Sequence, residues 1–286
     1  MQLNFTKMHG LGNDFIVIDA ISQKVDLNTE QVRFLADRHF GVGCDQLLLV
    51  EASEQKNIDF KYRIFNADGG EVEQCGNGAR CFARFVKEKK LTNKTTIVVQ
   101  TYTGLITLQL TEQDKVTVDM GKPEFHPEKL PFILSIGDSQ ANNRYTLAIK
   151  NSMTKQTENI EFSAVSMGNP HITIKVDDLE HYPVQEIGKL LESHPSFPNR
   201  VNVGFMQIID KQHIKLRVYE RGAGETLACG TGACAAVANG ITQQWLSGKV
   251  KVILATGYLQ IEWQNNEHSL MMTGAASFVY EGQIML

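Results

Sequence analysis

Two short segments of the sequence combine a cysteine with glycines at the start of an Ala-rich stretch. Residues 75–81 read Cys-Gly-Asn-Gly-Ala-Arg-Cys, and residues 229–235 read Cys-Gly-Thr-Gly-Ala-Cys-Ala. We call them the first and second cysteine boxes. A strand-like run precedes each box and a helical pattern follows it, so Cys75 and Cys229 are expected at helix N-termini. Helix starts bind anions and favour thiolate, so the sequence predicts that both sulfurs have a pKa below the ordinary value of about 8.5.

If the two boxes face each other, their sulfurs suit one reaction in particular, the inversion of a carbon that carries a hydrogen. That reaction needs a base on one face of the carbon and an acid on the other. The α-proton of an amino acid is only weakly acidic. Helix N-termini on the carboxylate would stabilise the negative charge that develops as this proton leaves. One sulfur would be thiolate and the other thiol, and the coupled pair would give a bell-shaped pH–rate profile.

Other uses of cysteine fit the sequence less well. Cys44, Cys81 and Cys234 are expected to be inert, since a buried free cysteine usually behaves as a small apolar residue. The spacing within the boxes is not that of a structural zinc site and no His pair completes one, so no metal is expected. No Cys-x-x-Cys redox motif is present, although Cys75 and Cys229 could oxidise to each other across a small pocket. The boxes also lack the Lys-Ser/Thr that follows the glycines of a P-loop.

The cysteine boxes end longer segments that recur in the same order. Residues 61–75 align without a gap on residues 215–229, and Arg, Gly, Glu and Cys coincide. The strand-like run of residues 12–18 is echoed by residues 168–174. Several blocks in register indicate a duplicated domain, with a period far too long for a solenoid. Residues 122–165 carry several prolines and a polar run, and are expected to form the crossover between the halves.

Both halves are rich in strands joined by short turns, and each contains one long helix that is apolar on most sides. Such a helix is a buried one. The sequence therefore predicts an α+β fold of two pseudo-symmetric domains, each a curled, mainly antiparallel sheet around a central helix. The first central helix is expected to run from its cysteine box to about Lys89. A shorter helix is expected to begin at the N-cap candidate Asn28, to continue through His39 and to stop at Gly41.

Composition excludes several classes of protein. The 286 residues carry a net charge of −4, and no basic stripe of the kind that binds nucleic acid is present. No apolar stretch approaches the roughly 18 residues of a membrane-spanning helix. The first residues lack the basic-then-apolar pattern of a signal peptide. A cytoplasmic location is therefore expected, where cysteines are more often buried, catalytic or metal-binding than disulfide-bonded.

Polar side chains in the repeated blocks suggest a cage for a ligand. The amides lie at strand ends or turns, at Asn13, Gln46, Asn66, Asn169 and Asn202. One such residue alone would be explained by turn chemistry, but their recurrence at matching positions favours ligand binding. Arg221 follows Glu220 and breaks the symmetry, because its counterpart is Ala67. Its planar guanidinium could bind a second carboxylate. His171 could tune a thiol or simply pack in the core.

Four segments of the sequence resemble the diaminopimelate epimerase family. They are residues 12–15 (Gly-Asn-Asp-Phe), 74–81 around the first box, 168–171 (Gly-Asn-Pro-His) and 220–232 around the second. The resemblance extends from about residue 5 to the C-terminus. It implies an isomerase that interconverts LL- and meso-diaminopimelate without a cofactor, for lysine and peptidoglycan precursor synthesis.

The resemblance also implies roles for individual residues. Cys75 and Cys229 would be the two acid–base residues, His171 and Glu220 would modulate the thiols, and Tyr280 would lie at a homodimer interface. Substrate contacts would come from Asn13, Gln46, Asn66, Gly76, Asn77, Asn169, Asn202, Glu220, Arg221, Gly230 and Thr231.

The resemblance further implies that the C-terminal segment returns to the first domain. The domains would then be residues 1–121 with 275–286, and residues 122–274, with the active site between them.

Two alternatives remain open at the level of the sequence. A proline or hydroxyproline racemase belongs to the same two-cysteine superfamily, but it has no use for a second carboxylate site such as Arg221 offers. A non-catalytic amino-acid-binding module would need the polar cage but not the two thiols.

Overall fold

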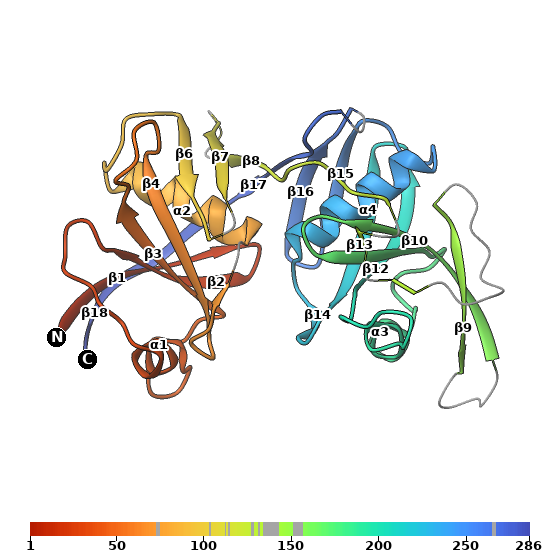
Figure 1. Cartoon of the computed structure of the whole chain (residues 1–286), viewed down its shortest axis with the longest axis horizontal. Helices are drawn as coiled ribbons and strands as arrows, with labels where there is room; N and C mark the ends of the chain where they lie inside the picture. Colours follow the sequence, from red (N-terminus) through yellow and green to blue (C-terminus); the bar gives the residue numbers. More distant parts are fainter. Residues whose placement is uncertain are drawn as a thin grey trace. The chain divides into compact units, whose positions relative to one another are not determined.

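The chain forms two compact units in its computed structural model (Figure 1). Unit 1 comprises Met1–Asp119 with Thr273–Leu286, and unit 2 comprises Met120–Met272. The structure describes residues 1–72, 75–102, 104–111, 113, 115–126, 129–130, 132–133, 143–150, 157–264 and 267–286. Gln74, next to the first cysteine box, and parts of the expected crossover lie outside the described residues.

The sheet of unit 1 is mixed, with antiparallel pairs in the majority. Its strands are β1 (Gln2–Gly10), β2 (Asn13–Asp19), β3 (Gln46–Ala52), β4 (Phe60–Asn66), β5 (Glu71–Val72), β6 (Thr96–Gln100), β7 (Leu105–Leu110), β8 (Lys115–Asp119) and β18 (Ser277–Met285). β1 pairs antiparallel with β18 and β2, β2 pairs parallel with β3, and β3 pairs antiparallel with β4. β4 then pairs parallel with β6, and β6, β7 and β8 continue antiparallel.

Helix α2 (Gly76–Glu88) lies inside this curled sheet and α1 (Thr29–Ala36) outside it (Figure 1). The strands between the helices are apolar on both faces, as expected of strands covered on both sides. Ile16 and Ile18 pack into the cluster that holds the buried face of α1. Phe15 points to the other face, where its ring borders Gly78 of α2. Because neighbouring strand residues point to opposite faces, one continuous apolar run serves both helices.

The N-terminus of α1 follows the sequence expectation, but its C-terminus does not. Asn28 is the N-cap, and its side chain and that of Gln31 form a reciprocal capping box. The helix ends at Ala36 instead of running through His39. The carboxylate of Asp37 accepts the backbone N–H groups of His39 and Phe40 at 2.7 and 2.8 Å. These local hydrogen bonds compete with the helical ones and end the helix early.

Unit 2 repeats the pairing order of unit 1. Its strands are β9 (Tyr145–Lys150), β10 (Thr157–Ser166), β11 (Pro170–Lys175), β12 (Asn202–Asp210), β13 (His213–Glu220), β14 (Gly224–Thr226), β15 (Lys249–Leu254) and β16 (Gly257–Glu262), and β17 (Met271–Ala275) crosses the boundary between the units. β10–β11 is antiparallel, β11–β12 parallel, β12–β13 antiparallel, β13–β15 parallel and β15–β16 antiparallel. The series from β1 to β7 alternates in the same way, so the α+β expectation is confirmed, with one central helix in each unit.

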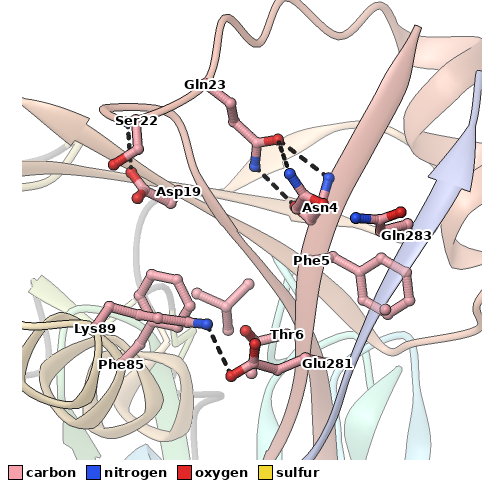
Figure 2. Close-up of a pocket in the computed structure, with 12 residues that line it drawn as sticks. Asn4, Phe5, Thr6, Asp19, Ser22, Gln23, Phe85, Lys89, Glu281 and Gln283 are labelled. Carbon is pink, nitrogen blue, oxygen red and sulfur yellow. Dashed lines mark hydrogen bonds and ion pairs between the residues drawn. The ribbon is translucent and has the colours of Figure 1, made fainter.

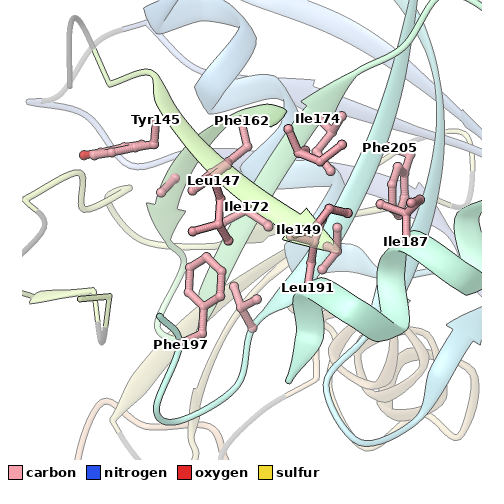
Figure 3. Packing of buried hydrophobic residues seen from close by; sticks show 14 of the residues in the cluster. Tyr145, Leu147, Ile149, Phe162, Ile172, Ile174, Ile187, Leu191, Phe197 and Phe205 are labelled. Carbon is pink, nitrogen blue, oxygen red and sulfur yellow. The ribbon is translucent and has the colours of Figure 1, made fainter. Parts of the chain in front are cut away.

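The central helix of unit 2 is α4 (Gly230–Thr242), and α3 (Val184–Glu192) covers the other face of the sheet. Nearly all residues of α4 are buried. Figure 3 shows the core beneath α3, where Ile187 and Leu191 approach Ile172 and Phe205 of the sheet. The two helices thus enclose a sheet that is apolar on both faces, as in unit 1.

The prediction that residues 122–165 form the crossover between the halves is wrong for the part of this segment that the structure describes. β9 and most of β10 fall within it and pair antiparallel, with Tyr145 opposite Phe162. Tyr145, Leu147 and Ile149 are buried in the core beneath α3. Their alternation with the more exposed Thr146 and Ala148 is the period of a half-buried strand, so this segment extends the sheet instead of only linking the halves.

None of the helices in the described part of the chain is long and apolar enough to cross a membrane.

Candidate active site

The first cysteine box forms the start of α2, and Cys75 is its N-cap. The sulfur accepts the backbone N–H of Gly78 at 3.4 Å, as a capping side chain does. Gly78 sits over the buried ring of Tyr62, and a Cβ added there would lie 2.5 Å from Tyr62 Oη. The glycine is therefore required by close packing, and the thiol is held by the helix start that the sequence predicts.

Asn13 and Asn77 lie beside the first thiol. Asn13 Oδ1 is 3.7 Å from Cys75 Sγ and accepts a hydrogen bond of 3.2 Å from Asn77 Nδ2. Asn13 opens β2 directly after a tight turn, in which Gly12 has a φ of 88°. A left-handed backbone of this kind suits glycine best. The turn therefore delivers the Asn13 side chain to the helix start.

Gln46 and Asn66 meet at the same edge of the sheet as Asn13. Gln46 begins β3 and pairs in register with Asn66 at the end of the antiparallel strand β4. Because β2 and β3 run parallel, their first residues share one edge of the sheet. Gln46 Nε2 donates to Asn66 Oδ1 at 2.9 Å. Gln46 Oε1 is buried and has no hydrogen-bond partner within the described part of the chain, so it is an acceptor available to a ligand.

The second cysteine box forms the start of α4, with Cys229 as its N-cap. Thr231 Oγ1 lies 3.7 Å from Cys229 Sγ, and Asn169 Nδ2 donates to the same oxygen at 3.5 Å. Asn169 and Thr231 thus occupy the places of Asn13 and Asn77, but here the sulfur contacts Thr231, the counterpart of Asn77. Gly76 and Gly230 are the first residues of the two helices and are buried, which leaves backbone N–H groups at both helix starts.

His171 reaches the second box through Asn169. Its Nε2 is 2.9 Å from Asn169 Oδ1. Burial, with the positive charge of Arg221 as a smaller cause, lowers the pKa of His171 from 6.5 to about 3. The imidazole is therefore neutral near pH 7, and because Oδ1 can only accept, Nε2 carries the proton. Its expected role in tuning a thiol would accordingly act through the orientation of Asn169.

The predicted low pKa is wrong for Cys229 in this ligand-free structure. Burial is the largest cause that raises the pKa of Cys229 well above its ordinary value, and the Glu220 carboxylate raises it further. The Gly232 N–H and the Thr231 hydroxyl lower it, but by less. Loss of hydration disfavours a charged group, and here it outweighs the helix N-terminus. Glu220 also accepts a hydrogen bond from Thr226.

Arg221 sits in a turn that is fixed by two buried residues. Asn202 donates from Nδ2 to Pro170 O and accepts the Arg221 N–H at Oδ1, both at 3.0 Å. The Asn202 amide therefore binds backbone groups in the ligand-free protein. To contact substrate as well, it would have to share one of these two hydrogen bonds. Glu192, at the end of α3, accepts the Gly222 N–H at 2.9 Å. Sequence reasoning missed Glu192, because nothing near it in the chain marks it as part of the site.

Tyr280 lies on β18, in unit 1. It pairs with Lys7 of β1, its ring packs edge-on against Phe5, and it is 47% exposed. An exposed aromatic residue on paired strands is suited to contact a partner, but it does not contribute to the candidate site.

A hollow of about 470 Å³ in unit 1 does not include the first cysteine box (Figure 2). It is bordered by β1, β18 and the last turn of α2, opposite the end that carries Cys75. Lys89 pairs with Glu281 there at 2.8 Å, and Gln23 bonds Asn4. These polar side chains are thus engaged with other groups of the protein. Among the described residues no group of three or more His, Cys, Asp or Glu side chains could hold a metal ion.

Solved structures define the class of fold. A hydroxyproline epimerase from Agrobacterium vitis, with bound trans-4-OH-L-proline, superposes with a TM-score of 0.70 at 16% identity, covering 99% of this chain and 92% of that one. A phenazine biosynthesis protein of the PhzF family from Bacillus anthracis gives a TM-score of 0.70 at 18% identity over the whole of both chains. At these identities the likeness concerns the fold alone.

Sequence comparison defines the family. The diaminopimelate epimerase family model matches residues 5–126 and 163–279. The diaminopimelate epimerase of Teredinibacter turnerae is 54% identical over 286 residues, which is 100% of both chains, and that of Pseudomonas savastanoi pv. phaseolicola is 52% identical over the same span. The chain belongs to the diaminopimelate epimerase family.

Proposed function

We propose that this protein is an isomerase that interconverts LL- and meso-diaminopimelate by a two-base mechanism. The observation that carries the proposal is the matched placement of Cys75 and Cys229, each the N-cap of a buried helix at the corresponding point of a repeated fold. Full-length identity to proteins named diaminopimelate epimerase supports the same reaction.

In the proposed reaction the two thiols act on opposite faces of one α-carbon. A thiolate removes the α-proton from one face, and the thiol of the other box delivers its own proton to the opposite face. Negative charge develops on the substrate carboxylate between these steps. The backbone N–H groups at the starts of α2 and α4, beginning with Gly76 and Gly230, would stabilise that charge. The proposed chemistry needs no cofactor, because sulfur carries the proton in both directions.

The raised pKa of Cys229 sets a condition on this mechanism. In the ligand-free protein the Cys229 sulfur is predominantly thiol near neutral pH, because burial and the nearby Glu220 carboxylate disfavour the thiolate. When Cys229 acts as the base, binding must therefore lower its pKa. A substrate ammonium close to Glu220 would offset the negative charge and do so. We propose Glu220 and, through Asn169, His171 as the groups that modulate this thiol.

The remaining contacts would hold the two ends of a long, doubly charged amino acid. We propose Asn13, Asn77 and Thr231 near the sulfurs, and Gln46, Asn66, Asn169 and Asn202 along the polar edges of the sheets. Arg221 would bind the distal carboxylate with its planar fork. Its counterpart in the first half is Ala67, so only the second half would bind the distal carboxylate of the substrate.

Several broader features are proposed with the reaction. The two units would be the duplicated domains, residues 1–121 with 275–286 and residues 122–274. The protein would act in the cytoplasm, in the synthesis of lysine and peptidoglycan precursors. It would form a homodimer in which Tyr280 contributes to the interface, a role supported by the exposure of its ring.

A second candidate is a proline or hydroxyproline racemase, which the fold likeness to the Agrobacterium vitis enzyme favours. Arg221, positioned by Asn202 and the Glu192 contact to the next residue, argues for a substrate with a second charged end. A binding module without catalysis would leave both matched thiols unexplained.

Deuterium exchange separates these candidates. The reduced protein is incubated with LL-diaminopimelate in deuterated water, without pyridoxal phosphate or added metal, and α-deuteration and the meso product are followed by NMR. We expect deuterium at the inverted carbon together with the meso isomer. Exchange on proline instead would favour the racemase. If both amino acids bind but neither exchanges its α-proton, the protein would be a non-catalytic binding module.

A further inference from the structure

A chain of four side chains runs through the first cysteine box. Arg80 Nη2 donates to Asn77 Oδ1 at 2.9 Å, Asn77 Nδ2 donates to Asn13 Oδ1 at 3.2 Å, and Asn13 Nδ2 donates to Asp45 Oδ2 at 3.0 Å. Cys75 Sγ lies 3.7 Å from the middle of this chain, at Asn13 Oδ1. Arg80 and Asp45 were not among the residues expected from the sequence to serve the site.

The two ends of this chain determine its direction. A guanidinium can only donate hydrogen bonds, and a carboxylate can only accept them. Asn77 must therefore turn its oxygen to Arg80 and its nitrogen to Asn13. Asn13 in turn must direct its nitrogen to Asp45, which leaves its oxygen facing the Cys75 sulfur. An oxygen in this position accepts from a thiol and repels a thiolate.

Both ends are themselves held in place. Arg80 is completely buried, and it also donates to the backbone oxygens of Ala275 and Gly76 at 3.2 and 3.3 Å. Asp45 accepts Arg38 Nη2 at 2.7 Å and the Asp14 N–H at 3.1 Å. Neither end can turn without the loss of further hydrogen bonds, so the direction of the chain is built into unit 1.

The Asp45 end belongs to a larger ion-pair group. Arg38 bridges Asp45 and Asp14, and Asp14 also pairs with the buried ammonium of Lys7 at 2.6 Å. Burial alone would raise the pKa of Asp14, but the hydrogen bonds and charge of Arg38 and Lys7 outweigh it and hold that pKa far below its ordinary value. Asp14 therefore stays ionised near neutral pH and keeps Arg38 in position against Asp45.

The second box presents the opposite arrangement. There the His171 N–H occupies Asn169 Oδ1, so Asn169 turns its nitrogen to Thr231 beside Cys229. The two matched asparagines thus direct opposite ends of their amides toward the two boxes. Asn13 faces the Cys75 sulfur directly, whereas Asn169 reaches Cys229 through Thr231, so the two boxes differ even though the fold repeats.

We propose that Asp45 and Arg80 are positioning residues that fix the direction of the Asn13–Asn77 hydrogen bonds, so that Asn13 presents its oxygen to Cys75 and keeps it a thiol before substrate binds. The proposal rests on the proposed function, in which Cys75 exchanges a proton with substrate. Neither Asp45 nor Arg80 would touch the reacting atoms. They act through Asn13 and Asn77, and they set which end of the Asn13 amide faces the Cys75 sulfur.

The test uses Asp45→Ala in the full-length protein, because the Asp45 side chain is nearly half exposed and its removal leaves the core intact. The rate at which iodoacetamide alkylates Cys75 is measured from pH 6 to 10 by peptide mass spectrometry. Without Asp45 the Asn13 amide loses one of the two hydrogen bonds that hold its oxygen against the sulfur, and it can move away from Cys75. We expect Cys75 alkylation at pH 7 to be about three- to tenfold faster than in the wild type. The kcat for epimerisation should fall more than KM changes.

Two variants serve as comparisons. Asp59→Ala also removes a carboxylate that pairs with one lysine and accepts one backbone N–H in unit 1, but at the far end of β4. It should leave Cys75 alkylation unchanged. Asp45→Asn keeps a carbonyl acceptor for Asn13 and should return the rate toward the wild-type value. Tyr62, Cys81 and Arg80 also lie near Cys75, and because no variant alters them, their effects cancel in the comparison.

The outcomes are distinct. An unchanged alkylation profile in folded Asp45→Ala would overturn the proposal, as would an equal acceleration in Asp59→Ala, which would indicate general loosening. The alkylation readout does not need turnover. If the wild type failed to epimerise diaminopimelate, the proposed function would fall, while the profile would still report whether Asp45 governs the sulfur through Asn13.

Discussion

The carboxylate of Glu192 accepts the backbone N–H of Gly222 across 2.9 Å, and so joins the end of α3 to the turn that carries Arg221. Arg200 donates to the same oxygen at 3.2 Å. This contact links a helix with no chemistry of its own to the residue proposed to bind the distal carboxylate. It also makes the position of Arg221 sensitive to a residue that need not touch substrate.

Replacing Glu192 should therefore weaken substrate binding more than turnover. In Glu192→Ala the Gly222 N–H loses its acceptor and the Arg221 turn loosens, so KM for diaminopimelate should rise about tenfold with a smaller change in kcat. Stability should fall by about 0.5–1.5 kcal/mol, because one hydrogen bond is lost while the exposed Gly222 N–H can turn to water. Steady-state kinetics and urea unfolding measure the two effects. Glu192→Gln keeps an oxygen for Gly222 and should restore most of the KM. An equal KM in both variants would contradict the positioning role.

Gly78 and Tyr62 should be coupled in stability. A Cβ at residue 78 would lie 2.5 Å from Tyr62 Oη, so Gly78→Ala should destabilise unit 1 by about 1–3 kcal/mol through overpacking. Tyr62 Oη is buried without a hydrogen-bond partner among the described residues, so Tyr62→Phe should be near neutral. The double variant should recover part of the loss, since the hydroxyl is gone. A double-mutant cycle by urea unfolding measures this coupling, and strictly additive effects would show that the contact is unimportant.

Stability should fall on mild acidification because of His171. Its native pKa is about 3 against 6.5 for the unconstrained side chain. Between these values the unfolded chain takes up a proton that the native protein does not, so unfolding becomes easier as pH falls through this window. The slope for one proton is about 1.4 kcal/mol per pH unit, and above pH 6.5 this group gives no dependence.

The contribution of His171 is isolated by comparison with His171→Gln, which cannot titrate. Urea unfolding at pH 7.5, 6 and 5 should show a steeper loss of stability for the wild type than for the variant. Parallel curves for the two proteins would mean that the native imidazole takes up the proton as readily as the unfolded one does.

Cys229 should react slowly in the ligand-free protein. Burial, with Glu220 as the next cause, raises its pKa well above the ordinary value, so little thiolate is present at pH 8 and iodoacetamide should modify it much more slowly than a free thiol. Glu220→Gln removes one cause and should speed the reaction, although burial should keep it below the free rate. Peptide mass spectrometry follows the modification. A wild-type Cys229 that reacts as fast as free cysteine would contradict the assigned environment.

Loss of either proposed acid–base sulfur should abolish epimerisation. Cys75→Ala and Cys229→Ala each remove the proton-transfer group on one face of the substrate, so kcat should fall by at least about 10²–10⁴-fold. Cys234→Ala is the matched control, because Cys234 is buried in α4 and is expected to be inert; it should keep near-wild-type turnover. A single box variant that retained normal turnover would refute the two-base mechanism.

Most of the correct predictions rest on short-range sequence patterns. The central helices follow from all-round apolar, Ala-rich stretches, and the Asn28 N-cap follows from local capping chemistry. The two thiols were placed at helix starts for the same reason, since the glycine-rich segments are local signals.

Features that depend on contacts distant in sequence were missed. Asp45 lies 32 residues from Asn13 and Glu192 lies 30 residues from Gly222, so no spacing rule connects either pair. The low pKa expected for Cys229 failed for a related reason. The helix start is visible in the sequence, but the burial that outweighs it is a property of the folded unit.

The pairing of β1 with β18 has a consequence for biosynthesis. Residues 120–272 form a continuous stretch, whereas unit 1 is completed only by Thr273–Leu286, whose strand lies along β1 from Met285 opposite Gln2 to Ser277 opposite His9. On the ribosome, residues 1–119 emerge first yet must wait for the last segment to cover the edge of β1, while unit 2 can close as soon as its own residues have left the exit tunnel. Unit 1 is thus begun before unit 2 but completed after it, with an open strand edge at β1 in need of protection in the interval.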